Sequence, residues 1–248
     1  MVKSASIAAA AAVSLCAIIG GAYLSLPVVV VVLSLVSLVV GFGWPHLLGV
    51  PAKKTLGSII AGSGIASAVT ASLLEGGRLL LWFPAIVAVG VALIFLVQLL
   101  RGTGQSLRLE STIGGTAGVL ICAMGGGWAA AEQLRSNAED SGMMLVTGTS
   151  VVIALLISLL PWPDRIIAPV GLVLATSAGL LGAILLADVP NLAAAIVGLV
   201  CGAVVVSFRR LIVARRGPQT LAGALAVGVA PIAALGTMVY FLEKLLLV

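Results

Sequence analysis

The chain has 248 residues, of which 61% are hydrophobic and only 8% are charged, and its mean hydropathy is +1.29. Soluble domains carry about 25% charged residues, so this chain has too few charged side chains to cover a water-facing surface. The composition excludes a soluble globular protein, a disordered chain and a disulfide-rich secreted domain. It predicts an integral membrane protein that consists almost entirely of membrane-spanning segments.

Nine apolar stretches are each long enough to cross a bilayer as a helix, which takes about 20 residues. In chain order they are 5–24, 26–44, 55–74, 79–100, 112–131, 143–161, 165–187, 190–208 and 220–241. The connections between them are too short to hold a soluble catalytic or nucleic-acid-binding domain. We therefore expect one all-α transmembrane bundle that covers residues 1–248.

The charged residues fall into alternate connections. With the N-terminus in the cytoplasm, the cytoplasmic segments hold ten basic and two acidic residues, and the outer segments hold three basic and six acidic residues, which together give the net charge of +5. Cytoplasmic loops of membrane proteins are enriched in Lys and Arg. The charges thus predict nine spans in a cytoplasmic membrane, with the N-terminus inside and the C-terminus outside.

The large aromatic residues fall near the ends of the predicted spans, where Trp and Tyr prefer the headgroup region. Trp44 and Trp162 lie at expected inner ends, and Tyr23, Trp82, Trp128 and Tyr240 lie at expected outer ends. The pattern predicts that all six rings lie at the membrane interfaces.

The first predicted span resembles a signal peptide, because Lys3 precedes a long Ala-rich run. A lipoprotein signal has a small residue before its cysteine, however, and here Leu15 precedes Cys16. We expect the segment to stay as the first span. If it is removed, eight spans remain in the same orientation.

Two Trp-Pro corners hint at an internal repeat. Gly43–His46 closes the second span and 161–164 closes the sixth. The spacing fits two parallel halves of four spans followed by a ninth span, an organisation related to that of many transporters. The clustering of Trp and Pro at helix ends explains the same observation without a repeat. Pro231, in the middle of the last span, predicts a kink there.

Polar side chains inside the spans are scarce. Gln98 is the largest, and His46, the single histidine, follows Trp44-Pro45 near an inner end. His46 suits either proton or substrate contact, or a hydrogen bond to a freed carbonyl or a headgroup. The acidic residues lie at or beyond the span ends and the three cysteines lie in different spans, so we expect no metal, cofactor or catalytic centre.

Four arginines form a basic patch on the expected inner surface. They are Arg209, Arg210, Arg215 and Arg216, and they flank a short apolar run before Gly217-Pro218. Each would gain about 1 kcal/mol beside anionic inner-leaflet headgroups, and the patch also suits docking of a cytoplasmic partner or an anionic substrate. The basic pI follows from membrane topology and does not indicate a nucleic-acid partner.

Several short segments resemble uncharacterised polytopic membrane proteins of actinobacteria, some of which are loosely labelled permeases. The segments are Gly43–Pro51, Gln98–Arg101, Arg108–Ser111 and Trp128. The resemblance implies a multi-pass fold and brings no catalytic residue, cofactor or partner with it.

Two functions fit the sequence. The first is a permease-like transporter of an uncharged or lipid-like solute, which agrees with the number of spans and the lack of a soluble domain. The second is a non-transporting membrane subunit or scaffold in envelope assembly or regulation. The small-residue pairs Gly114/Gly118 and Gly198/Gly202 favour this second function, because such pairs bring helices together within one chain, in a homo-oligomer or against a membrane partner.

The topology can be tested by labelling single cysteines with an impermeant maleimide in intact cells, after Cys16, Cys122 and Cys201 are replaced. We expect K54C to stay unlabelled until the membrane is opened and E139C to react from outside. Labelling of K54C without labelling of E139C would reverse the orientation.

Overall fold

A computed structural model describes residues 2–102, 106–137, 142–160, 162–187, 189–214 and 220–246. These residues form α-helices and one 3-10 turn, with no strand among them. The helices are α1 (Val2–Ala22), α2 (Leu26–Leu48), α3 (Lys53–Leu73), α4 (Phe83–Leu100), α5 (Arg108–Met124), α6 (Gly127–Asn137), α7 (Met143–Ser158), α8 (Asp164–Leu186), α9 (Asn191–Ala214) and α10 (Leu221–Leu246), and the 3-10 turn is Gly76–Arg78.

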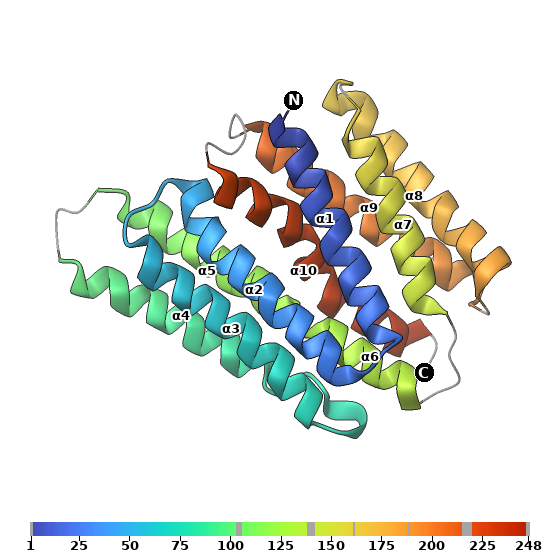
Figure 1. The fold of residues 1–248 in the computed structure, drawn as a ribbon, viewed down its shortest axis with the longest axis horizontal. Helices are drawn as coiled ribbons and strands as arrows, with labels where there is room; N and C mark the ends of the chain where they lie inside the picture. Colours follow the sequence, from blue (N-terminus) through green and yellow to red (C-terminus); the bar gives the residue numbers. More distant parts are fainter. Residues whose placement is uncertain are drawn as a thin grey trace.

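The helices run back and forth between two ends of the bundle (Figure 1). The N-terminus, the last residues of α2, α4, α7 and α9 and the first residues of α3, α5, α8 and α10 lie at one end, here called the N-terminal end. The C-terminus lies at the other end. Helices α5 and α6 follow one another and together cross the bundle once. The segments expected on one side of the membrane therefore share one end of the bundle.

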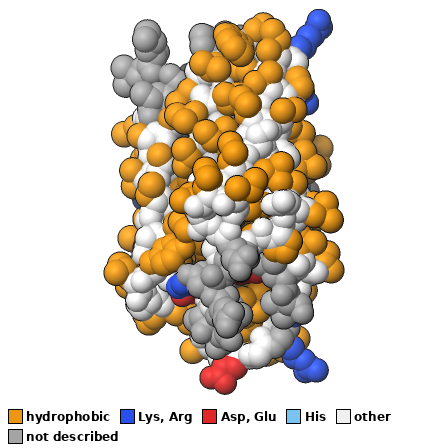
Figure 2. Space-filling model, turned by 90° about the vertical axis from the view of Figure 1, so that its right-hand side faces the viewer, with side chains coloured by type: hydrophobic (Ala, Val, Ile, Leu, Met, Phe, Trp, Pro, Cys, Tyr) orange, Lys and Arg blue, Asp and Glu red, His pale blue; other side chains and the backbone are white. Residues whose placement is uncertain are grey.

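Seven segments are long and apolar enough to span a membrane: α2, α3, α4, α8, α9, α10 and the segment Arg108–Arg135, which joins α5 and α6. The apolar parts of α1 (Ser6–Ala22) and α7 are shorter. Exposed Leu, Val, Ile and Phe side chains occur along most of the helices, and hydrophobic side chains cover most of the face shown in Figure 2. The protein is a multi-pass helical membrane protein.

Helix α10 lies at the centre of the bundle, where it contacts α1, α2, α5, α6 and α9. On one side of it α2, α3, α4 and α5 pack together, and on the other side α7, α8 and α9 pack together (Figure 1). The predicted repeat would divide the chain into two halves after the fourth span. The two packing groups do not follow this division, because α5 and α6, which form the fifth predicted span, pack with α2 and α3. The repeat itself stays a prediction.

The fifth predicted span, 112–131, is divided by a break at Gly125 and Gly126. A Cβ on Gly126 would lie 2.7 Å from the main-chain carbon of Ser67 in α3, so only glycine allows this close approach. Helix α6 then continues to Asn137 between α3 and α10. The prediction that Glu132 lies in an outer loop was wrong, since its exposed fraction is 4%.

Other helix ends also differ from the sequence prediction. Helix α2 continues through Pro45 to Leu48, and α4 begins at Phe83, where Pro84 in the first turn suits a helix start. Helix α10 extends to Leu246, so that Glu243 is buried instead of lying beyond the span. Glu139, Asp140 and Asp188, which also entered the charge argument, lie outside the described residues.

The six aromatic residues that the sequence places at the interfaces differ in their exposure, since three are exposed and three are buried. Trp82, Trp162 and Tyr23 are exposed. Trp44 and Trp128 are buried, and each indole nitrogen donates a hydrogen bond to a carbonyl of another helix, Gly114 O at 2.9 Å and Ile232 O at 2.8 Å. Tyr240 is buried as well. Tryptophan combines an apolar body with one donor, so it can also join two helices inside a bundle.

The packing of α2 against α3 is sensitive to a single methyl group. A Cβ on Gly41 would lie 2.7 Å from the backbone nitrogen of Ala61 and 2.8 Å from Gly57 O. We expect G41A to lower stability by about 1–3 kcal/mol through overpacking, measured as thermal unfolding of the purified protein in detergent. The control G62A places its methyl group in open space and should stabilise α3 by about 0.5–1 kcal/mol. Equal melting temperatures for the two variants would contradict this account.

Candidate functional site

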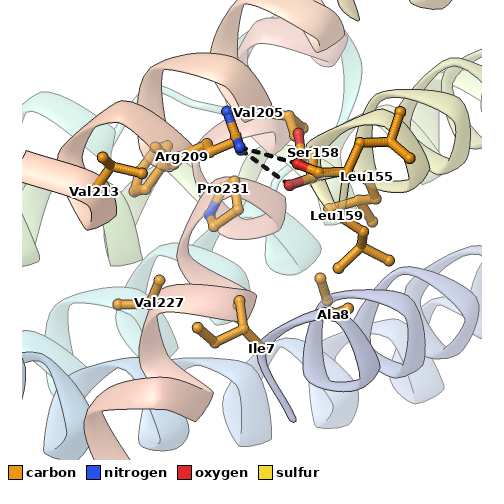
Figure 3. A pocket seen from close by; sticks show the side chains of 14 residues that line it. Ile7, Ala8, Leu155, Ser158, Leu159, Val205, Arg209, Val213, Val227 and Pro231 are labelled. Atoms are coloured by element: carbon orange, nitrogen blue, oxygen red, sulfur yellow. Dashed lines mark hydrogen bonds between the residues drawn. The ribbon is translucent and has the colours of Figure 1, made fainter. Parts of the chain in front are cut away.

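A cavity of about 350 Å³ lies between α1, α7, α9 and α10 (Figure 3). Four helices that are distant in sequence form its walls: Ile7, Ala8 and Ala11 of α1; Leu155, Ser158, Leu159 and Leu160 in and after α7; Val205, Phe208, Arg209 and Val213 of α9; and Val227, Gly228 and Pro231 of α10. Apart from Ser158 and Arg209, no lining residue has a polar side chain. A volume of this size is at the lower end of the range for small-molecule sites.

The cavity reaches from the N-terminal end of the bundle to its middle. Arg209 and the residues that end α7 lie at the N-terminal end, whereas Pro231 is ten residues into α10. At 1.5 Å per residue, ten residues span about 15 Å, which is about half the thickness of the hydrocarbon core. The cavity therefore extends over about half the length of a membrane-spanning helix.

Pro231 adds a polar group to the wall of this cavity. Proline has no backbone N–H, so the carbonyl of Val227, one turn earlier in α10, loses its helical donor. Val227 and Pro231 both line the cavity. The carbonyl of Val227 is thus left without its helical donor, although α10 continues through Pro231 as one helix.

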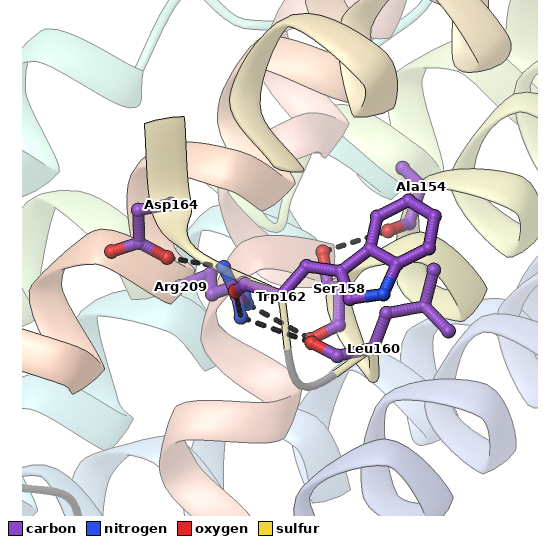
Figure 4. Close-up of polar contacts among 6 residues, drawn as sticks. All are labelled: Ala154, Ser158, Leu160, Trp162, Asp164 and Arg209. Carbon is purple, nitrogen blue, oxygen red and sulfur yellow. Dashed lines mark hydrogen bonds and ion pairs between the residues drawn. The ribbon is translucent and has the colours of Figure 1, made fainter. Parts of the chain in front are cut away.

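Arg209 joins three helices at the mouth of the cavity (Figure 4). Its Nε donates to Ser158 O at 2.9 Å and its Nη2 donates to Leu160 O at 3.2 Å, which satisfies carbonyls at the C-terminus of α7. Its Nη1 forms an ion pair with Asp164 in the first turn of α8. The guanidinium is favourable next to the negative end of the α7 dipole, and the carboxylate is favourable at the positive end of α8.

No known protein family, curated protein or solved structure matches the chain. The chemistry of the cavity is therefore derived from its own residues.

The polar groups of the lining are suited to binding and not to bond cleavage. The hydroxyl of Ser158 donates to Ala154 O at 2.7 Å, and no lining side chain is a general base for it. Arg209 is neutralised by Asp164. The cavity thus offers an apolar chamber with a few fixed polar groups, which fits a molecule with a hydrocarbon body and no net charge.

The structure brings together two of the residues singled out from the sequence, Pro231 and Arg209. Arg210 is exposed and does not line the cavity, and Arg215 and Arg216 lie outside the described residues. His46 lies in the last turn of α2, where its Nδ1 donates to Phe42 O at 2.7 Å. Gln98 lies at the end of α4. Neither His46 nor Gln98 lines the cavity.

A buried polar layer at the opposite end of the bundle was missed from the sequence. Glu132 and Arg135 of α6 form a bidentate ion pair with distances of 2.8 and 2.9 Å, and Arg135 also donates to Ala22 O at the end of α1. Gln133 donates to Ala71 O of α3 at 2.8 Å. The spacing of Glu132 and Arg135, three residues apart, was the available signal for a helical ion pair.

The described part of the chain contains no group of three or more His, Cys, Asp or Glu side chains that could hold a metal ion. Its cysteines are unpaired: Cys16 is exposed, and Cys122 and Cys201 are buried in different helices.

Arg209 is expected to stabilise the corner between α7 and α8. We expect R209Q to lower the free energy of unfolding by about 1–3 kcal/mol, because carbonyls of α7 and the carboxylate of Asp164 lose a charged donor. The matched control R210Q removes an exposed arginine with no hydrogen bond in the described part of the chain, and should change stability by less than about 0.5 kcal/mol. Unfolding in detergent, followed by intrinsic fluorescence, measures both variants. A similar loss of stability in both variants would show that the change in net charge is the cause, and not the loss of the hydrogen bonds to α7 and of the ion pair with Asp164.

Proposed function

We propose that the protein is a nine-span, permease-like transporter of an uncharged or lipid-like solute in the cytoplasmic membrane of a bacterial cell. In this proposal the N-terminus is cytoplasmic and the C-terminus is outside. The observation that carries the proposal is the apolar cavity between α1, α7, α9 and α10, which extends from one end of the bundle to its middle.

The composition of the lining supports the choice of solute. A charged solute would need a counter-ion in the chamber, and the one charged lining residue, Arg209, already has Asp164 as its partner. An uncharged hydrocarbon body needs only apolar walls, and the Val227 carbonyl gives one acceptor for a hydroxyl or amide.

The helix arrangement provides a way for the cavity to open toward the other side. The cavity is lined by α7 and α9 on one side and by α1 on the other, and α10 contacts both α1 and α9. Because α10 lacks a hydrogen bond at Pro231 beside the cavity, it is the element best able to bend. A small rotation of the α7–α9 group about α10 would change the side of the bundle from which a solute can enter the cavity, as in transporters that move one helix group against another.

Filling the cavity should block ligand binding while the fold is kept. Ala8 lines the cavity, and its neighbour Ala9 is exposed on the same helix. We expect A8F to lower photolabelling of the lining residues by a diazirine-bearing alkanol about ten-fold, and A9F to leave it unchanged. Peptide mapping by mass spectrometry locates the label. Equal labelling in A8F and wild type would mean that the cavity does not hold the probe.

Transport itself requires a flux measurement. Proteoliposomes should show protein-dependent movement of at least one member of a panel of uncharged solutes and fluorescent lipids, and A8F should slow it where A9F does not. Flux that is the same in protein-free liposomes, or in A8F and wild type, would defeat the transport proposal even if the alkanol binds.

The second candidate function, a non-transporting membrane subunit, is favoured by a groove between α3 and α4. This groove has a volume of about 560 Å³ and includes Ser58, Gly62 and Ala66, which are spaced four residues apart on α3. Small residues at this spacing allow the close approach of another helix in lipid. Copurification of one membrane protein in equal amounts, lost in G62L but kept in A8F, together with no flux, would favour this function over transport.

A further inference from the structure

Two guanidinium groups lie together at the end of α4, and neither has a carboxylate partner among the described residues. Arg101 follows the last residue of α4, and Arg108 is the first residue of α5. Arg101 Nη1 donates to Gln98 Oε1 at 2.9 Å, and Arg108 Nη2 donates to the main-chain oxygen of Gln98 at 3.0 Å. In the described part of the chain, no Asp or Glu oxygen lies within 4.0 Å of either group.

Most of the hydrogen-bonding capacity of this pair is unused. A guanidinium has five N–H donors, and Arg101 and Arg108 each make one hydrogen bond to the described protein. Arg209 provides the contrast, since it is neutralised by Asp164 and also donates to backbone carbonyls. Both Arg101 and Arg108 are half-buried, so their charges are only partly screened by solvent.

Gln98 contributes another donor beside the two arginines. Its side chain is 3% exposed, and its Nε2 has no hydrogen-bond acceptor among the residues that the structure describes. The orientation of the amide follows from Arg101, which can only donate, so the atom that faces it must be the oxygen. The cluster therefore combines two cations with a buried N–H donor that lacks an acceptor, which is a combination that favours an anion.

The surroundings of the cluster favour an amphiphilic anion. Leu99 and Leu100 precede Arg101, Leu107 and Leu109 flank Arg108, and all four side chains are exposed. The cluster lies where α4 ends, at the N-terminal end of the bundle. A membrane-length helix ends at the level of the lipid phosphates, so a bound headgroup would place its acyl chains against these leucines.

We propose that Arg101, Arg108 and Gln98 bind the phosphate of an anionic phospholipid headgroup. Arginine pairs suit phosphate because their planar N–H groups match its oxygens. This assignment differs from the sequence prediction, which placed headgroup contact at the patch around Arg209. In the structure Arg209 forms an intramolecular ion pair. The lipid site at Arg101 and Arg108 does not depend on the transport proposal.

The proposal is tested with the full-length chain, stripped of lipid in detergent and titrated with short-chain phosphatidylglycerol in native mass spectrometry. We expect R101Q and R108Q each to weaken binding roughly five-fold, the effect of removing one basic residue near anionic lipid. The control R165Q removes an exposed arginine at the start of α8, at the same end of the bundle, and should bind as wild type does.

A second variant separates lipid binding from a purely structural role. Q98E keeps the shape of the side chain and places a carboxylate next to the guanidinium of Arg101, so it should weaken phosphatidylglycerol binding at least five-fold while the melting temperature is kept or raised. A structural role alone predicts unchanged lipid binding in Q98E, and that result would overturn the proposal.

The same titration distinguishes the source of the phosphate. Phosphatidylglycerol should bind more tightly than zwitterionic phosphatidylcholine, and millimolar inorganic phosphate should not displace it. Displacement by inorganic phosphate would show that the cluster binds the free ion, and equal affinity for the two lipids would show that only the acyl chains are recognised. Either result would overturn the assignment.

Discussion

Close contact between helix backbones at small residues is the constraint on which this bundle depends. Helices in lipid have little hydrophobic reason to associate, so close approach must supply the dispersion contacts. A Cβ on Gly179 would lie 2.7 Å from Ala194 O and one on Gly198 would lie 2.6 Å from Ala175 O, which brings α8 and α9 together. Gly41 does the same for α2 and α3. These contacts define the two helix groups on either side of α10.

The cavity lies where this close packing is interrupted. Helix α1 approaches α10 closely at Gly228, where a Cβ would lie 3.1 Å from that of Ala10. The side chains of α1 that face α7 and α9 are small at Ala8 and Ala11, so they do not fill the space between the groups. The chamber is thus a consequence of small side chains at an interface between two groups, and Pro231 places a polar carbonyl in its wall.

Three arginines have the same role at helix ends. Arg209 donates to Ser158 O of α7, Arg135 to Ala22 O of α1 and Arg108 to Gln98 O of α4. Each of these carbonyls lies in the last turn of its helix, where the backbone has no internal donor and the dipole is negative. Arg209 and Arg135 also have acidic partners, whereas Arg108 has none within the described ranges. This difference makes the end of α4 the place where an external anion fits.

The sequence by itself determined the class of protein and the approximate course of the helices, because hydrophobic length and the distribution of charge are local properties of the chain. Arg209 and Pro231 could be singled out for the same reason, as a charge and a helix breaker. Only the tertiary structure decided that they meet in one cavity, that Trp44 and Trp128 are buried, and that Glu132 lies inside the bundle with Arg135. The sizes of the side chains set the spacing between helices, and this spacing determines which residues of distant helices share a cavity. A local sequence pattern does not contain this information.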